Sequence, residues 1–240
     1  MRAGPVRRAA LLLALAIPAC GDDSESPEGP NGALGGSAST ETLARIRLGE
    51  RPAGPLVWVA HEVRLAPGQA IEHEHEPAFV YGRGGEPSPE GSADGAVAAG
   101  APHRHEASDD EAVYWEIRLA HPGAPPPPGA DDARRVFESE PLEGIPAPAQ
   151  ASLIEVRVPP RGGSTTVHTH PGPEFIYQLS GRIDYQNEIV GTKLLGPGGA
   201  EGIPPGTAVQ KRNPYVEPAR FVSLFLVDPD RPFAPKASFR

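Results

Sequence analysis

The sequence contains a single cysteine, Cys20, which excludes a disulfide-bonded framework. Aromatic residues make up only 6% of the chain and hydrophobic residues 38%, so a folded core is possible but not large. Clusters of basic residues are missing after the first eight positions, and the net charge is −9. Because neutralising phosphates requires clustered Lys and Arg, we expect no nucleic-acid partner.

The chain also lacks an apolar run long enough to span a bilayer. Its longest run, AALLLALAIPA at 9–19, is far shorter than the roughly 20 apolar residues that a membrane-spanning helix needs. Arginines precede this run, and it ends on the small residue Ala19 directly before Cys20. The pattern is typical of a secretory signal peptide over 1–19, so we expect an exported protein.

Residues 17–20, Ile-Pro-Ala-Cys, resemble the lipobox of bacterial lipoproteins. That resemblance implies that Cys20 is lipid-modified and anchors a cell-envelope protein, periplasmic or on the outer surface, to a membrane. The alternative is an ordinary secretory signal with a chance cysteine. The polar residues that follow predict a disordered tether over 20–41, because they can bury almost no apolar surface.

Glycine and proline are abundant, at 28 and 31 residues, and they punctuate the rest of the chain. The stretch 83–102 is rich in Gly, Ala, Ser and Pro and predicts an irregular loop. A proline-rich segment predicts a semi-rigid linker over 123–130 between two domains, at 42–122 and 131–240.

Between these segments, short apolar stretches alternate with a period of two, and no helical pattern of comparable strength follows the signal. This periodicity predicts strands and an all-β fold, a sandwich or a barrel. The predicted strands cover 56–65, 112–120, 151–158, 174–180 and 219–227.

Two parts of the chain repeat one pattern. EVRLAPG at 62–68 is followed by HEHEPAFVY at 73–81, and EVRVPPRGG at 155–163 is followed by HTHPGPEFIY at 168–177. The first copy is shorter between its landmarks. We therefore predict two related units, of which the first has lost material.

The second unit carries the most specific motif of the sequence. Its residues resemble the first cupin motif, G(X)5HXH(X)3,4E(X)6G, at Gly162, His168, His170, Glu174 and Gly181. The resemblance implies a bicupin, with two double-stranded β-helix barrels of which the first is shortened or degenerate. It covers nearly all of the chain after the signal.

Physical reasoning supports a metal site at this motif. His168 and His170 lie two apart on a strand and share a face, and the following turn brings Glu174 back beside them. Two imidazoles and a carboxylate suit a first-row transition metal. Gln178 shares the face of Glu174 and is a candidate cavity residue. The alternative is a metal-free barrel with hydrogen-bonded core histidines.

The second cupin motif, G(X)5PXG(X)2H(X)3N, is incomplete. It fits Gly198, Pro204, Gly206 and Asn213, but Val209 stands at the expected histidine. The adjacent Gln210 would point to the opposite face of its strand and is a poor replacement. A usual fourth ligand is therefore missing.

The first unit shows the opposite pattern. His73 and His75 repeat the histidine pair, His103 aligns with Val209, and Ala78 stands where the second unit has Glu174. This predicts a three-histidine metal site, and the alternative is a degenerate barrel kept for packing. We expect His105 to be exposed to solvent. His61 and His121 are expected to be bystanders.

These observations favour a metal-binding bicupin of the bacterial cell envelope, with a divalent Fe, Mn, Zn, Cu or Ni ion as cofactor. A dioxygenase or another metal-dependent enzyme acting on a small organic molecule is the first expectation, and no catalytic residue is assigned. The alternative is a non-catalytic lipoprotein that binds a small ligand. A homo-oligomer is compatible with either.

Overall fold

The computed structural model describes residues 34–49, 53–84 and 95–240. These residues form sixteen strands and no helix, which confirms the predicted all-β class. Within those ranges there is accordingly no helix long and apolar enough to cross a membrane. The predicted signal peptide at 1–19 and Cys20 lie outside the described residues, as do residues 85–94 of the predicted irregular loop.

All five predicted strands are present. They are inner strands of two antiparallel five-stranded sheets. Successive side chains of a strand point to opposite faces of its sheet, so apolar residues of these strands can pack on both faces. The five strands are β2 (Val57–Leu65), β7 (Ala112–Ala120), β9 (Ala149–Val158), β11 (Glu174–Ser180) and β16 (Ala219–Val227).

The second unit consists of a five-stranded and a four-stranded sheet that enclose an apolar core. Ile154, Ile176 and Phe221 of the larger sheet are buried with Tyr185 and Val209 of the smaller one. The larger sheet has the order β1 (Ser39–Leu48), β9, β16, β11 and β14 (Ala200–Ile203). The smaller has the order β10 (Gly163–Ser164), β15 (Val209–Asn213), β12 (Ile183–Asn187) and β13 (Gly191–Leu195).

The first unit repeats this plan with fewer strands, as the shortened repeat predicts. Its larger sheet has the order β5 (Ala96–Val97), β4 (Ala78–Gly84), β7, β2 and β8 (Ala133–Glu138). Opposite it lie only two strands, β3 (Ala70–His73) and β6 (His103–Glu106). Among the described residues, a two-stranded sheet therefore stands where the second unit has a four-stranded sheet, and the core between the sheets is small.

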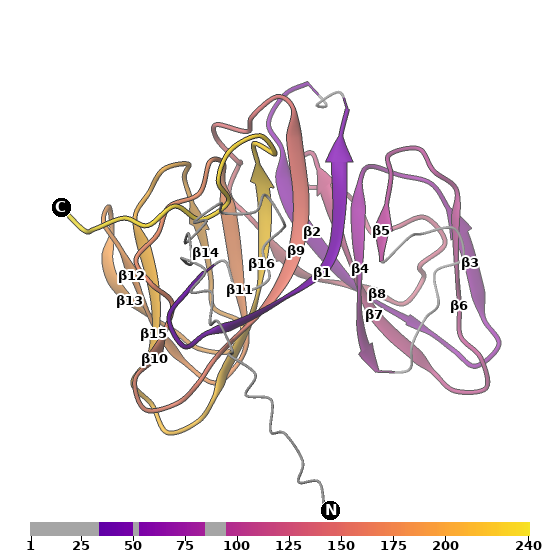
Figure 1. Ribbon diagram of the computed structural model, residues 1–240. Coiled ribbons are helices and arrows are strands. Elements are labelled where there is room, and N and C mark those ends of the chain that lie inside the picture. Colours follow the sequence, from indigo (N-terminus) through magenta and orange to yellow (C-terminus); the bar gives the residue numbers. More distant parts are fainter. Residues whose placement is uncertain (1–33, 50–52, 85–94) are drawn as a thin grey trace, which may run out of the picture.

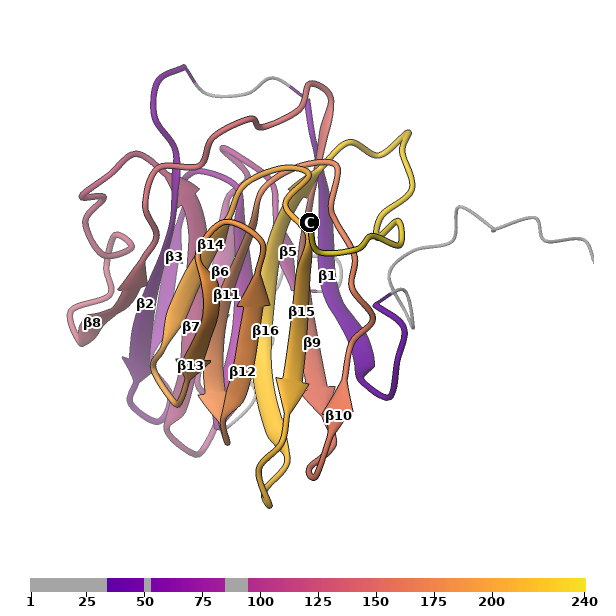
Figure 2. The same cartoon turned by 90° about the vertical axis from the view of Figure 1, so that its left-hand side faces the viewer.

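The two five-stranded sheets pack against each other in the middle of the molecule (Figures 1 and 2). Trp115 and Phe137 of the first unit meet Tyr177 and Phe175 of the second, with ring centroids 5.5 Å apart for Trp115–Tyr177 and 5.1 Å for Phe137–Phe175. Because side chains alternate along a strand, the residues between these face the interior of their own barrel. The candidate ligands lie on those inner faces.

The units exchange strands across the predicted boundary. β1, expected in the first unit, pairs with β9 of the second, and β8, expected in the second, pairs with β2 of the first. The chain therefore crosses between the sheets before β2 and after β8, rather than at the proline-rich segment 123–130. Sheet pairing depends on distant partners, so local composition does not reveal this exchange.

Residues 34–41 of the tether predicted over 20–41 are folded, and residues 20–33 lie outside the described residues. Leu34 is only 1% exposed, and the backbone amide of Ser37 donates to the carbonyl of Ser164 at 2.9 Å. Gly36 has a positive φ of 71°, and a Cβ there would collide with the same carbonyl. Residues 34–41 are thus part of the folded second unit.

Candidate metal centre

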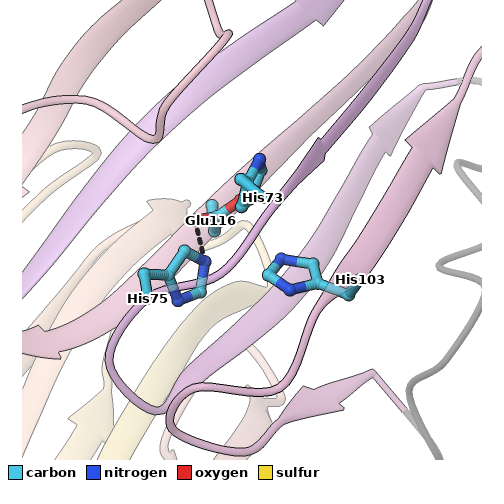
Figure 3. A group of neighbouring side chains, drawn as sticks. All are labelled: His73, His75, His103 and Glu116. Atoms are coloured by element: carbon cyan, nitrogen blue, oxygen red, sulfur yellow. Dashed lines mark hydrogen bonds and ion pairs between the residues drawn. The ribbon is translucent and has the colours of Figure 1, made fainter.

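Four polar side chains of the first unit converge inside its barrel (Figure 3). One ligand atom from each of His73, His75, His103 and Glu116 lies within 4.8 Å of every other. His73 ends β3 and is the direct register partner of His103, which begins β6. Glu116 comes from the middle of β7, on the opposite sheet. The site therefore bridges both sheets of the unit.

Hydrogen bonds orient two of these imidazoles toward the centre. The Nδ1–H of His75 donates to the carbonyl of Glu76 at 2.6 Å, and that of His103 donates to the carbonyl of Ala101 at 3.1 Å. The Nε2 of His103 is buried and has no hydrogen-bond partner, whereas the Nε2 of His75 lies 2.5 Å from a Glu116 oxygen. A backbone partner at one nitrogen and a free lone pair at the other is the usual arrangement of a metal-ligating histidine.

The electrostatics of the cluster favour an ionised Glu116 carboxylate and a neutral His103 imidazole. Burial alone would raise the pKa of Glu116, but hydrogen bonds with His105, His73 and His75 hold it well below its ordinary value. Burial lowers the pKa of His103 to about 4. Deprotonated groups of both kinds are what a divalent ion requires.

Glu116 was not among the residues identified from the sequence. It occupies an inward position of β7, 0% exposed, and the Nε2 atoms of His73 and His75 lie 3.1 and 2.5 Å from its carboxylate oxygens. The signal that could have found it is an acidic residue in the middle of an otherwise apolar alternating strand, AVYWEIRLA.

The expectation that His105 is exposed to solvent is wrong. Its side chain is 0% exposed, its Nε2 lies 3.5 Å from Glu116, and its ring stacks on Tyr114 with centroids 4.6 Å apart. The physical reason is the strand period of two, which gives His103 and His105 the same inward face. His61 is also buried and is the register partner of Glu116, whereas His121 is exposed.

The second unit places its predicted ligands inside its own barrel. His168, His170 and Glu174 are 0%, 3% and 0% exposed, and the Nε2 of His170 lies 3.5 Å from a Glu174 oxygen. The Nδ1–H groups of His168 and His170 donate to the carbonyls of Thr166 and Phe233, both at 2.8 Å. The metal role of these three residues stays a prediction.

A cation of the chain itself lies at this second site. The ammonium group of Lys211 donates to both Glu174 oxygens, at 3.0 and 2.9 Å, and is 0% exposed. The hydroxyl of Ser223 donates to the same carboxylate at 2.8 Å. Burial, and then the Lys211 charge, lowers the pKa of His168 and of His170 to about 3. The sequence analysis missed Lys211, although its position two residues after Val209 gives it the inward face.

One family model matches the sequence, and it is described as "Cupin domain". The match covers residues 154–225, from within β9 to within β16. We call this matched segment the cupin domain, because it is similar to that family. It includes His168, His170, Glu174, Lys211 and Ser223. No curated protein matches the chain.

Several solved structures resemble parts of the chain. The polyketide cyclase RemF from Streptomyces resistomycificus is 28% identical over 38% of this chain and 62% of its own, with a TM-score of 0.33. The DMSP lyase DddQ from Ruegeria pomeroyi DSS-3 is 26% identical over 34% and 40%, with a TM-score of 0.32. AerE from Microcystis aeruginosa is 13% identical over 78% and 99%, with a TM-score of 0.48. The chain thus aligns with less than two thirds of RemF and of DddQ.

The strand registers relate the cupin domain to the first unit position by position. His73 pairs with His103, as His168 pairs with Val209. Ala78 pairs with Arg118 in the same way that Glu174 pairs with Phe225. Counting back two residues along β7 and β16 makes Glu116 equivalent to Ser223. The carboxylate of the first unit therefore comes from β7, the neighbour of the strand that would correspond to β11, and it still faces the same site.

The two sites differ in how well they fit a divalent ion. Both sets contain buried imidazole nitrogens without a hydrogen-bond partner, and in the first set a converging carboxylate completes the group of ligand atoms. In the cupin domain, both carboxylate oxygens already accept from Lys211. No second group of three His, Cys, Asp or Glu side chains converges in the same way within the described ranges.

The predicted cavity residue Gln178 is buried, at 1% exposed. Its Nε2 donates to the carbonyl of Ser180 at 2.7 Å, and its Oε1 has no hydrogen-bond partner. No hydrogen bond joins its side chain to His168, His170 or Glu174 in the described part of the chain. Gln178 lines a cavity between the two units, and its role beside the His168, His170 and Glu174 site stays a prediction.

Proposed function

We propose that this chain is a metal-dependent cupin protein whose divalent transition metal is held in the first unit by His73, His75, His103 and Glu116. The convergence of these four ligand atoms within 4.8 Å carries the proposal. The expected cofactor is Fe, Mn, Zn, Cu or Ni, and the expected substrate is a small organic molecule. A dioxygenase or a related metal-dependent enzyme is the activity that this site supports best.

Each residue has a definable task at such a site. When bound, the ion would supply Lewis acidity or oxygen activation. Glu116 contributes the negative charge, and the three imidazoles contribute nitrogen lone pairs. His105 lies 3.5 Å from the Glu116 carboxylate and helps to hold its orientation. The apolar residues Val63, Leu65 and Ile71 in the core beside β3 and β6 limit access of water.

Metal analysis combined with a turnover assay tests this proposal. We expect one divalent metal per chain in the purified protein, and oxygen uptake with at least one member of a panel of flavonoids, thiols, phenols and keto acids after reconstitution with single metals. Turnover should be abolished by His103→Ala and retained in the Glu174→Met/Lys211→Met double variant, which removes the carboxylate of the second unit without leaving Lys211 unpaired. A chain with no metal after reconstitution would contradict the proposal.

A cavity supports the second candidate, a non-catalytic protein that binds a small ligand. It has a volume of about 260 Å³ and lies between the two units, with lining residues that include Arg83, Trp115, Arg134 and Tyr177. The Arg83 guanidinium stacks over Trp115 at 4.6 Å. Aromatic and cationic walls suit a small planar anion. Saturable binding without turnover under any metal would favour this function.

The location of the protein is a separate proposal, that it is exported and anchored in the cell envelope through lipidated Cys20. The basic residues, the apolar run and the small Ala19 before Cys20 support it. Replacing Cys20 with serine is expected to move the protein from the membrane fraction to the soluble fraction, because the acyl chain is lost. Cell fractionation with immunoblotting measures this, and wild-type protein that is already soluble would contradict it.

A further inference from the structure

The buried cluster around Lys211 in the cupin domain has no role in the function proposed above. Lys211, Glu174 and His168 are each 0% exposed, so the cluster is closed to solvent. Two of the three ammonium hydrogens point to the two oxygens of one carboxylate. Ser223 occupies a third acceptor position on the same group. The carboxylate is therefore largely saturated by groups of the chain itself.

The position of Lys211 in the strand pattern explains how it reaches the ligands. β15 presents Val209, Lys211 and Asn213 to the interior, all at 0% exposed. By the register equivalence of His103 and Val209, Lys211 corresponds to His105 of the first unit. A histidine beside one metal-ligand set is thus replaced by an ammonium beside the other.

Charge balance opposes adding an ion while Lys211 is in place. The Lys211 ammonium lies 2.9 Å from the Glu174 carboxylate, so the two opposite charges of this buried pair balance each other. A divalent cation would leave the ammonium without its partner in a site that excludes water, and an unpaired buried charge is strongly unfavourable. In the described part of the first unit, no lysine or arginine donates a hydrogen bond to Glu116, and the Arg118 guanidinium lies 3.9 Å from one of its oxygens.

From these observations we propose that the Lys211 ammonium takes the place of the metal in the cupin domain, so that His168, His170 and Glu174 bind a divalent ion only when Lys211 is removed. The inference does not depend on the metal site of the first unit. The chain thus holds two copies of one site, and the copy in the cupin domain contains the Lys211 ammonium in place of an ion.

Cobalt binding to full-length variants tests this inference. In a His73→Ala/His75→Ala chain, which disables the first site, we expect no bound Co²⁺ after dialysis. Adding Lys211→Met should raise the content to one Co²⁺ per chain, with visible d–d absorption bands, and His168→Ala should remove it again. Lys193→Met is the matched control, because Lys193 pairs with Glu201 at 3.0 Å on the exposed side of the sheet and should change nothing.

If Lys211→Met does not fold, Lys211→His is tested in its place, because an imidazole at this position repeats the arrangement of His105 in the first unit. A folded Lys211→Met or Lys211→His chain without Co²⁺ would overturn the inference. So would a Lys211-containing chain that already binds one Co²⁺ and loses it on His168→Ala. Failure of the proposed function has a different signature, namely no difference in metal content between the wild type and the His73→Ala/His75→Ala chain.

Discussion

Replacing Glu116 with glutamine is expected to lower the affinity of the chain for a divalent transition metal by about 100-fold or more. The carboxylate is the only anionic group among the four converging ligands, and the side chain that replaces it is neutral. His103→Ala should have an effect of the same size, because it removes a buried imidazole whose Nε2 has no other partner. Competition of Co²⁺ or Zn²⁺ with a chromophoric chelator measures the affinity.

A matched control comes from the strand that carries His103. Glu106 lies on the outer face of β6, its side chain is 51% exposed, and it pairs with Arg104 at 2.9 Å. Glu106→Gln therefore removes one acid from the same strand without touching the site, and metal affinity should stay unchanged. Full metal content in the Glu116 and His103 variants, with loss on His168→Ala, would place the metal in the second unit and refute the proposal.

Removing one partner of the buried pair in the second unit is expected to have the largest effect on stability. Glu174→Met should lower the free energy of unfolding by about 3–5 kcal/mol, because Lys211 then holds a buried charge without a counter-ion. Combining it with Lys211→Met should recover most of the loss, since two apolar side chains of similar length replace the pair. Urea denaturation followed by circular dichroism measures both.

The exposed pair Lys193–Glu201 provides the comparison for this result. Its N–O distance is 3.0 Å, similar to that of the buried pair, but the Lys193 side chain is 44% exposed. Glu201→Gln should change the free energy of unfolding by less than about 1 kcal/mol, because water screens the charges. Equal effects of Glu174→Met and Glu201→Gln, or no recovery in the double variant, would show that the buried pair does not control stability.

Periodicity and spacing were informative wherever a feature depends on residues close in the chain. The alternating segments are the five central strands, because alternation reflects burial of one face. The repeat of the histidine pair places His73 and His75 next to His103, since both units share one strand arrangement. Local order also explains why His168, His170 and Glu174 are buried together.

Two groups that decide the chemistry come from strands remote from these motifs. Glu116 replaces the carboxylate lost at Ala78 from a neighbouring strand, and no spacing rule links the two positions. Lys211 stands outside the expected motif positions, and its effect depends on Glu174 reaching it from the opposite sheet. Alternation along a strand could have predicted that Lys211 and His105 face the interior, but it could not have identified the residues that they contact.

The sequence by itself determined that the chain is all-β, that it contains two related units with a shortened first one, and that each unit carries a buried histidine pair, because these properties are encoded by period, spacing and repetition. Tertiary structure decided the exchange of β1 and β8 between sheets, the transfer of the carboxylate to Glu116 and the pairing of Lys211 with Glu174. Each of these depends on the register between strands far apart in the chain, which packing of the whole barrel selects and no local pattern records.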